Sequence, residues 1–473
     1  MSLFKPSAML SDAFGTLVVR MVGIALIFGS TTLTARILGP AEYGAYSAAT
    51  ALALLLATLA PLGSDRILVQ SLSTSKSDTE IGRETAITHL GTACSVAVLF
   101  CGLMATWLCC TFVVVNPNWA RTSALAAILF VPLTIIYLRQ WLAIPLIGAR
   151  RAVMPEQTIL PLIFITTLFT VAVMKLPLTA TTTVIAYAGM ILFVWLLSLK
   201  PKRIRIAYRS AISVFPEIPK PVVFQRMMAG LAYVAVAVGA TIAQSCMPLT
   251  IAVTCGFTET AYYALAMPFA ALAAIPLGVF NLTTFPRCSR LYQKGQMAEA
   301  EHTVRSAATI MFGLSVGIGF VVWMLSPMLV VLLGIEYTTV CRLLPALLLA
   351  AMIDSLTGPT LPVMQTMKME QTCGRMLYAS IPVQLGLIYL LSRIASVEGA
   401  AVAYLLSRVL WNVAVVLVIK RLRGITMLPY LSFRLAWREF HELPGHPAAQ
   451  TDPVINPPAV EQVWSIAAER KVA

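Results

Sequence analysis

Three charged side chains lie deep inside long apolar stretches of the sequence. Arg139 and Arg408 each fall near the middle of such a stretch, and so does Asp354. A charge at the centre of a bilayer costs about 2.5–3.5 kcal/mol on insertion scales, so these residues usually face a cavity or a partner. A guanidinium group donates two parallel hydrogen bonds, which suits a phosphate. The two arginines therefore predict a wet cavity that accepts an anionic substrate.

Two interpretations of these residues stay open. In the first, Arg139 and Arg408 line a central cavity from the two halves of the chain, and Tyr137 and Trp141 beside Arg139 stack on sugar rings. In the second, Asp354 and Arg408 form an ion pair that holds two helices together. The aromatic side chains are then ordinary helix packing. Both interpretations describe binding and packing rather than bond-making chemistry.

Other charged residues lie near the ends of apolar stretches. Arg20 is about one turn inside its stretch, so it either joins the cavity or extends to the headgroups. Glu42 and Glu259 each follow a glycine that can end a helix, and a carboxylate in the first turn of the next helix favours its positive N-terminus. An ion-coupling role is the alternative for these two. Asp65 and Arg66 are expected to form a solvated pair.

Residue patterns for metal, nucleotide or enzyme chemistry are absent from the sequence. Its nine cysteines form no CxxC pair and its four histidines are scattered, so no metal site is predicted. There is no GxxxxGK[ST] loop, so the chain has no nucleotide-driven motor of its own. A membrane polymerase or glycosyltransferase would need a large external loop with acidic or arginine residues, and the outer loops are short. We expect no cofactor and no enzymatic activity.

The elements that must position these residues are transmembrane helices. Hydrophobic residues make up 59% of the 473 and charged residues only 11%, against roughly 25% charged in soluble domains. The apolar blocks are about twenty residues long, which matches a membrane-spanning helix and excludes a barrel. We therefore predict an all-α integral membrane protein of about twelve transmembrane helices, near 16–35, 44–64, 88–112, 123–147, 156–174, 181–199, 227–247, 261–285, 306–333, 342–363, 376–392 and 399–419.

The basic residues predict the orientation of these helices. With the N-terminus in the cytoplasm, 26 of the 34 Lys and Arg residues fall on the cytoplasmic side and 5 on the other. The positive-inside rule then places both termini in the cytoplasm. The net charge of +14 does not indicate nucleic-acid binding, because the basic residues lie in short loops without a continuous basic face.

An internal repeat divides the chain into two halves. The segment Gly39–Tyr46 recurs at Gly256–Tyr263, and Pro145–Arg151 recurs at Pro362–Lys368, both with an offset of 217 residues. Six spans separate the copies, so both halves enter the membrane in the same direction and form two parallel six-helix bundles with substrate between them. The expected domains are residues 1–199, a cytoplasmic linker 200–226, residues 227–423, and a mostly disordered cytoplasmic tail 424–473.

Three segments carry a resemblance to a known family, over roughly residues 10–420. They are Ala35–Tyr46 with Leu62–Arg66, Phe285–Gly295, and Leu333–Tyr337. In this order and topology they resemble the bacterial polysaccharide-repeat (O-antigen, Wzx-like) flippases, of the multidrug/oligosaccharidyl-lipid/polysaccharide exporter superfamily. That superfamily also includes the peptidoglycan-precursor flippase.

The resemblance implies a V-shaped pair of bundles in the bacterial cytoplasmic (inner) membrane. It implies that the substrate is an oligosaccharide on a polyprenyl pyrophosphate, used in lipopolysaccharide or exopolysaccharide biosynthesis. In this family, basic residues within the spans are thought to meet the anionic headgroup, and the candidates here are Arg20, Arg139 and Arg408. The partners implied are the lipid-linked glycan, membrane lipids, and a polysaccharide polymerase or other assembly machinery.

Two other classes of transporter are alternatives. One shares this scaffold, and the other also has two six-helix halves. A cation-coupled multidrug or small-solute exporter would favour buried carboxylates in the first half, whereas the one deep carboxylate expected is Asp354 in the second. A sugar/proton symporter has a loop signature that Gly63–Arg66 faintly resembles. The basic pair that should follow is missing from Ile67–Gln70. We therefore favour the lipid-linked glycan flippase.

Overall fold

The computed structural model describes residues 6–424 and 427–430, apart from 76, 115, 279–287, 289, 290, 293, 359, 361, 362, 365, 366 and 368. Side chains at 6–14, 16–18, 20, 74, 232–240, 243, 244, 332, 335 and 370 also lie outside the described part. The predicted tail after residue 430, most of the motif 285–295 and the Arg20 side chain therefore fall outside it. All regular elements among the described residues are helices.

The first half contains six membrane spans. The helix α1 holds two of them, joined at Gly39, and three shorter helical pieces follow one another from residue 149 to make a single span. A separate short helix, α2, follows the second span. The elements are α1 (Pro6–Leu59), α2 (Ser64–Thr74), α3 (Asp78–Phe112), α4 (Pro117–Ile147), α5 (Ala149–Met154), the π-helical turn η1 (Pro155–Ile159), α6 (Leu160–Val173) and α7 (Ala180–Leu197).

The second half repeats this plan after a helical connector. The last helix, α15, also holds two spans, joined at Ala395 and Ser396. The prediction of about twelve transmembrane helices is thus confirmed. The elements are α8 (Lys202–Val214), the 3-10 turn η2 (Phe215–Glu217), α9 (Lys220–Thr254), α10 (Phe257–Leu272), α12 (Met297–Leu333), η3 (Ile335–Tyr337), α13 (Thr338–Leu356) and α15 (Glu370–Arg423).

The two copies of the repeat break their helices in the same way. Gly39 has φ 74° and ψ 169°, and Gly256 has φ 95° and ψ −179°. Only glycine adopts this backbone conformation readily, so each copy needs its glycine where one helix stops and the next begins. Pro40 follows Gly39 and suits the first turn of a helix. The shared break supports the repeat that the spacing predicts.

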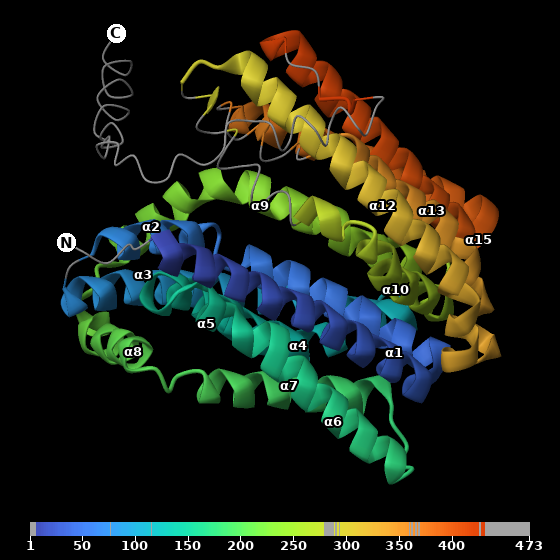
Figure 1. Cartoon of the computed structure of the whole chain (residues 1–473). Coiled ribbons are helices and arrows are strands. Elements are labelled where there is room, and N and C mark those ends of the chain that lie inside the picture. The colour runs from blue at the N-terminus through green and yellow to red at the C-terminus, as the bar shows by residue number, and fades with distance from the viewer. Residues whose placement is uncertain are drawn as a thin grey trace.

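The two bundles pack together at the end of the molecule that carries Gly39 and Gly256, here called the Gly39 end (Figure 1). An added Cβ on Gly44 would collide with the backbone of Phe257, so the helices touch there without side chains between them. The Tyr337 hydroxyl donates a hydrogen bond of 2.6 Å to the Ala35 carbonyl across the two halves. Toward the opposite end, called the Gly63 end, α12, α13 and α15 spread away from the first bundle (Figure 1).

Helix α9 packs on both bundles. Near the Gly63 end its backbone at Gly230 touches the backbone at Gly63, and Arg226 forms an ion pair with Glu84 on α3. Farther along, Ile251 belongs to the apolar core that joins α9 to α1 and α10. The sequence assigns most of α9 to the expected second domain, residues 227–423. In the structure, α9 packs on helices of both halves.

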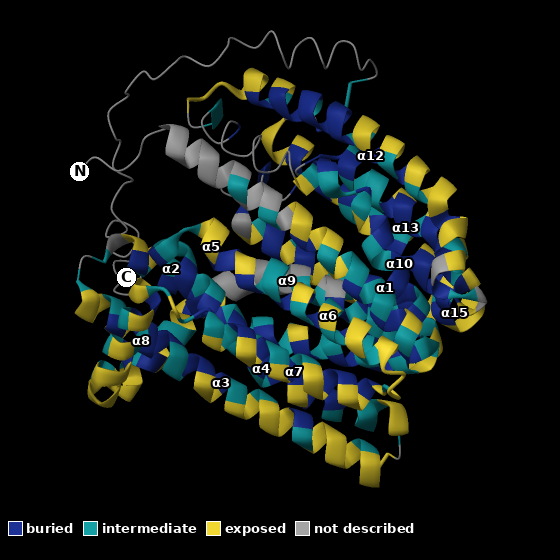
Figure 2. Cartoon of the chain, turned by 60° about the horizontal axis from the view of Figure 1, so that its bottom comes forward, coloured by how far each residue is buried: buried dark blue, intermediate teal, exposed yellow. Residues whose placement is uncertain are grey.

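The outer faces of the helices are apolar, as a lipid environment requires. Large side chains such as Val98 on α3, Val331 on α12 and Ile394 on α15 are 72%, 84% and 85% exposed. The exposed residues run along the outward side of α3 in Figure 2. By length and composition, eight described helical stretches could cross a membrane, and those in α1 and α15 are long enough for two crossings each. The chain is an all-α integral membrane protein.

Candidate functional site

In the second half, the structure brings Asp354 and Arg408 together. Arg408 Nε lies 3.8 Å from Asp354 Oδ2, a distance that allows an ion pair but exceeds a hydrogen bond. The Asn412 amide donates to Asp354 Oδ1 at 2.7 Å, and Thr357 donates to the Asn412 oxygen at 2.6 Å. Each partner of the ion pair keeps 24% of its side chain exposed. The ion-pair interpretation describes this arrangement.

Helical spacing explains why these groups meet. Tyr404, Arg408 and Asn412 are each four residues apart on α15, so their side chains lie on one face of the helix. That face packs against the end of α13, where Asp354 lies. The Arg408 guanidinium also lies 5.0 Å from the centroid of the Tyr404 ring. The cation is thereby oriented by an aromatic ring and a carboxylate.

In the first half, Arg139 is enclosed within its own bundle. Only 1% of the residue is exposed. Its Nη1 donates to the Ala152 carbonyl at 2.6 Å and its Nη2 to the Ser198 carbonyl at 3.4 Å. Ser198 caps the C-terminus of α7, where carbonyls lack helical partners, and Ala152 lies just before the π-helical turn. Arg139 therefore ties α4 to α5 and α7, and its side chain is enclosed by the described residues of the first bundle.

A carboxylate that sequence reasoning missed lies near Arg139. Glu156 belongs to the π-helical turn η1, close enough to Arg139 for electrostatic interaction. Its Oε1 is buried and accepts no hydrogen bond from any described residue. The expectation that Asp354 is the one deep carboxylate is therefore wrong. Glu156 is the first residue of the span predicted near 156–174, and the preceding Pro155 is the one sequence signal of the irregular turn there.

Tyr137 and Trp141 form a second cluster with residues of α2. Trp141 lies under the Arg66 guanidinium, 4.1 Å from its ring centroid, and the Tyr137 hydroxyl is 3.5 Å from Asp65 Oδ2. Asp65 is only 5% exposed, so the prediction of a solvated Asp65–Arg66 pair is wrong for this residue. Burial raises the pKa of the Asp65 carboxyl, and the neighbouring Arg66 acts in the opposite direction. The reason for the burial is that α2 packs on α4.

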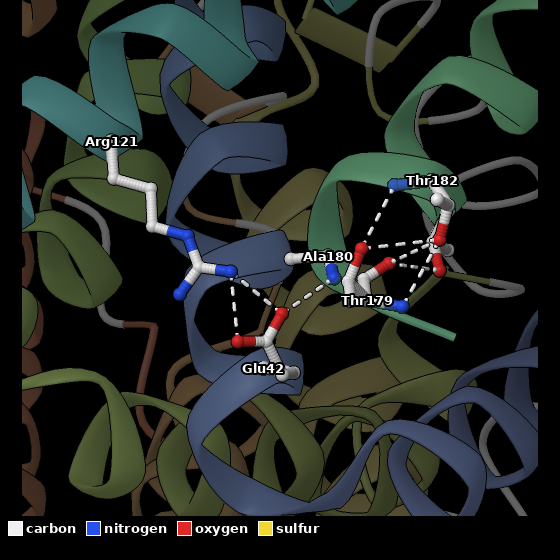
Figure 3. Close-up of polar contacts among 6 residues, drawn as sticks. Glu42, Arg121, Thr179, Ala180 and Thr182 are labelled. Atoms are coloured by element: carbon white, nitrogen blue, oxygen red, sulfur yellow. Dashed lines mark hydrogen bonds and ion pairs between the residues drawn. The ribbon is translucent and has the colours of Figure 1, made fainter. Parts of the chain in front are cut away.

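Glu42 connects three helices at the Gly39 end (Figure 3). Arg121 Nη2 donates to both carboxylate oxygens, at 2.8 and 2.6 Å, and the Ala180 amide donates at 2.6 Å. Ala180 begins α7, so the carboxylate meets the N-terminus of that helix rather than of its own. In the second half, Thr338 stands at the position that corresponds to Arg121, so Glu259 lacks the equivalent partner.

An apolar cavity of about 630 Å³ lies between α3 and α4. Its lining includes Phe100 and Ala97 on α3 and Val131 on α4, and Phe215 from η2 also borders it. Phe100 and Ala97 are exposed on the outside of the bundle, so a chain of lipid could enter from the membrane. The cavity is separate from the polar clusters around Arg139 and Arg408.

Of the predicted cavity residues, the structure joins Asp354 with Arg408 and Tyr137 with Trp141, whose rings are 6.0 Å apart. It places Arg139 alone inside the first bundle, away from the Asp354–Arg408 pair. The side chain of Arg20, the remaining candidate, lies outside the described residues. The candidate site therefore consists of separate polar clusters in the two bundles.

No protein-family model matches the chain, and no curated protein matches it in sequence. Solved structures share its fold. An inward-facing multidrug resistance MATE family transporter of the MOP superfamily superposes with a TM-score of 0.69 at 12% identity, over 87% of this chain and 98% of that one. The lipid II flippase MurJ in an inward closed conformation gives 0.63 at 12% identity, over 87% of both chains. An outward-facing MATE transporter gives 0.56 at 13% identity, over 86% of this chain and 94% of that one. At these identities the likeness establishes the fold, which is the two-bundle helical membrane fold of these proteins.

Proposed function

We propose that this chain moves a polyprenyl-pyrophosphate-linked oligosaccharide across the bacterial cytoplasmic membrane by alternating access. The observation that carries the proposal is the partly exposed Arg408 inside a membrane span, in a fold shared with the lipid II flippase MurJ. The three sequence segments that resemble polysaccharide-repeat flippases support the substrate class. A polysaccharide polymerase or other assembly machinery is the partner that such a role implies.

Alternating access suits the way in which the bundles meet. They are in contact at the Gly39 end and spread apart at the Gly63 end (Figure 1). If the Gly39 end lies outside, as the charge distribution predicts, the structure is open toward the cytoplasm, where a lipid-linked glycan is made. Rocking the two bundles would then close the Gly63 end and open the Gly39 end.

Arg408 is the residue that we expect to meet the pyrophosphate. The 3.8 Å contact with Asp354 balances its charge without a direct hydrogen bond from Nε. A phosphate would accept two hydrogen bonds from the planar guanidinium. The Arg66–Trp141 pair, in which Arg66 keeps 42% of its side chain exposed, offers a second cation beside an aromatic ring. The apolar cavity between α3 and α4 suits part of the isoprenoid chain.

Reconstituted vesicles test this proposal. Vesicles that contain the purified protein and a fluorescent polyprenyl-pyrophosphate oligosaccharide are exposed to a membrane-impermeant glycosidase, which cleaves substrate on the outer leaflet. We expect substrate initially protected inside to become cleavable over time, and Arg408→Ala to slow this at least tenfold. Arg393→Ala is the matched control, because this arginine is exposed and contacts Tyr389 one turn away on its own helix. A rate equal to that of protein-free vesicles would refute the flippase proposal.

A second candidate function is export of a multidrug-type or other small solute coupled to a cation. Glu156 favours it, because this reading expects a carboxylate inside the first bundle, and the MATE structures share the fold. Efflux of a lipophilic cationic dye from cells that lack their own exporters distinguishes the two. Dye efflux that depends on this chain, without movement of the lipid-linked glycan in vesicles, would favour the exporter.

A further inference from the structure

The π-helical turn in the first bundle carries an unusual set of buried polar atoms. The side-chain oxygens Glu156 Oε1, Gln157 Oε1 and Thr158 Oγ1 are buried and have no hydrogen-bond partner among the described residues. Leaving buried polar groups unpaired is costly, and native structures rarely do so without a functional reason. π-helical turns are themselves frequent at functional sites. The turn therefore needs a role beyond packing.

We propose that the carboxyl group of Glu156 binds and releases a proton inside the first bundle, and that Arg139 exchanges hydrogen-bond acceptors as it does so. The proton comes from the aqueous phase and adds to Oε1, whose lone pairs are not used by any described donor. A hydronium ion gives up this proton and becomes water, so one O–H bond breaks and one forms, with no other covalent change. The proposal concerns an ion rather than the transported substrate, so it does not depend on the proposed function.

The hydrogen bonds of Arg139 fit a neutral carboxyl group. Both bonds go to backbone carbonyls, at Ala152 and Ser198, although Glu156 lies within electrostatic reach. A guanidinium bonds more strongly to a carboxylate than to a carbonyl. An ionised Glu156 would therefore attract Arg139, whose Nε has no partner among the described residues. The proton thus decides whether Arg139 ties α4 to α5 and α7 or to η1.

The groups around Glu156 favour a proton over a metal cation. Arg139 on α4 carries a permanent positive charge that would repel a second cation. Tyr187 on α7 interacts electrostatically with Glu156, and Tyr208 on α8 interacts in the same way with Arg139. From α1, Gly23 packs against Gln157, and Arg20 lies about one turn earlier with its side chain outside the described part. A proton neutralises the carboxylate and leaves Arg139 bonded as observed.

Infrared difference spectroscopy of the full chain in lipid nanodiscs tests this site without any substrate. On acidification we expect a band from a protonated carboxyl group in an apolar environment, which Glu156→Gln abolishes and Asp354→Asn preserves. The Gln side chain mimics the neutral carboxyl, so this variant should remain folded. Arg139→Gln should shift the midpoint of the band to higher pH, because the guanidinium no longer favours the ionised form.

Three outcomes would overturn the proposal. One is a wild-type spectrum without such a band between alkaline and acidic pH. The second is a band that persists unchanged in Glu156→Gln, and the third is a band lost in Asp354→Asn instead. Glu156→Asp provides a second variant, in which the band should remain at a shifted frequency because the carboxyl group is kept. None of these results bears on whether the chain moves a lipid-linked glycan.

Discussion

Several charged side chains inside the bundles contact a partner on another helix. Two carboxylates of the bundles reach other helices: Glu42 on α1 reaches α4 and α7, and Asp354 on α13 reaches α15. Removing one member of such a pair leaves the other charge without compensation in an apolar region. Stability measurements on single and paired substitutions therefore reveal which contacts matter.

The Asp354–Arg408 pair gives the first prediction. Arg408→Ala should lower the free energy of unfolding by about 1–3 kcal/mol, because Asp354 loses its charge partner. The double change Asp354→Asn/Arg408→Ala should recover most of that loss. Thermal denaturation in detergent, followed by tryptophan fluorescence, measures both. If Arg408 also binds the pyrophosphate, the double variant will be stable yet inactive, whereas a stable and active double variant would show a purely structural role.

Glu42 gives a second prediction at the same scale. Glu42→Ala should destabilise the protein by about 1–3 kcal/mol, since it leaves Arg121 and the Ala180 amide without their acceptor. Glu259→Ala is the matched control from the other repeat, where Thr338 replaces the arginine, and it should change stability much less. Melting temperatures of the two variants are compared side by side. Equal losses would mean that the carboxylate acts through its own helix N-terminus in both repeats.

Helices meet closely enough at the Gly39 end for one added side chain to separate them. Gly44 on α1 faces the backbone of Phe257 at the start of α10, with no room for a Cβ. These two positions lie in the two copies of the repeat, so the repeat itself forms the contact between the bundles. The α9 contact at Gly63 and Gly230 is similarly close at the other end.

Gly44→Val should open the Gly39 end. The valine cannot fit against the Phe257 backbone, so we expect the bundles to move apart there and the population to shift toward the opposite state. Spin labels at Asn118 and Arg342, at the starts of α4 and α13, report this as a longer distance in a cysteine-free background. Gly102→Val on α3 is the control, because open space surrounds Gly102. An unchanged distance in Gly44→Val would contradict the close contact.

At the scale of the whole molecule, the charge distribution predicts the orientation in the membrane. The basic connector that contains α8 and the loop before α4 lie at opposite ends of the first bundle. The distribution of Lys and Arg predicts that the connector lies in the cytoplasm. The orientation then decides whether this structure is open to the inside or the outside.

A labelling experiment checks this orientation. A membrane-impermeant thiol reagent should reach a cysteine at Asn118 from outside intact cells, and one at Arg205 only after the membrane is opened. Both positions should be tested without the native cysteines, several of which are exposed on α3. Labelling of the Arg205 variant in intact cells would reverse the assignment of the two ends.

The structural features that this sequence predicts well are those that depend on residues close together in the chain. Blocks of about twenty apolar residues predict helices because a backbone in lipid must satisfy its own hydrogen bonds. The glycines at 39 and 256 predict helix breaks because few other residues adopt a positive φ. The Asp354–Arg408 contact was one of two open interpretations, and helical spacing alone could not select it.

The tertiary structure decided which partners the charged side chains found. Arg139 faces Ala152 and Ser198, and Asp65 is buried beside Tyr137, although no sequence pattern links these positions. Such contacts depend on how each helix is rotated and where it crosses its neighbours, and apolar spans of similar composition do not specify either. Glu156 shows most clearly what the sequence leaves open. A shift of a few residues in the predicted span boundary decides whether Glu156 lies at the headgroups or inside the first bundle. The sequence by itself determined the helices, their breaks and their expected orientation, whereas the packing angles between helices determined the polar sites.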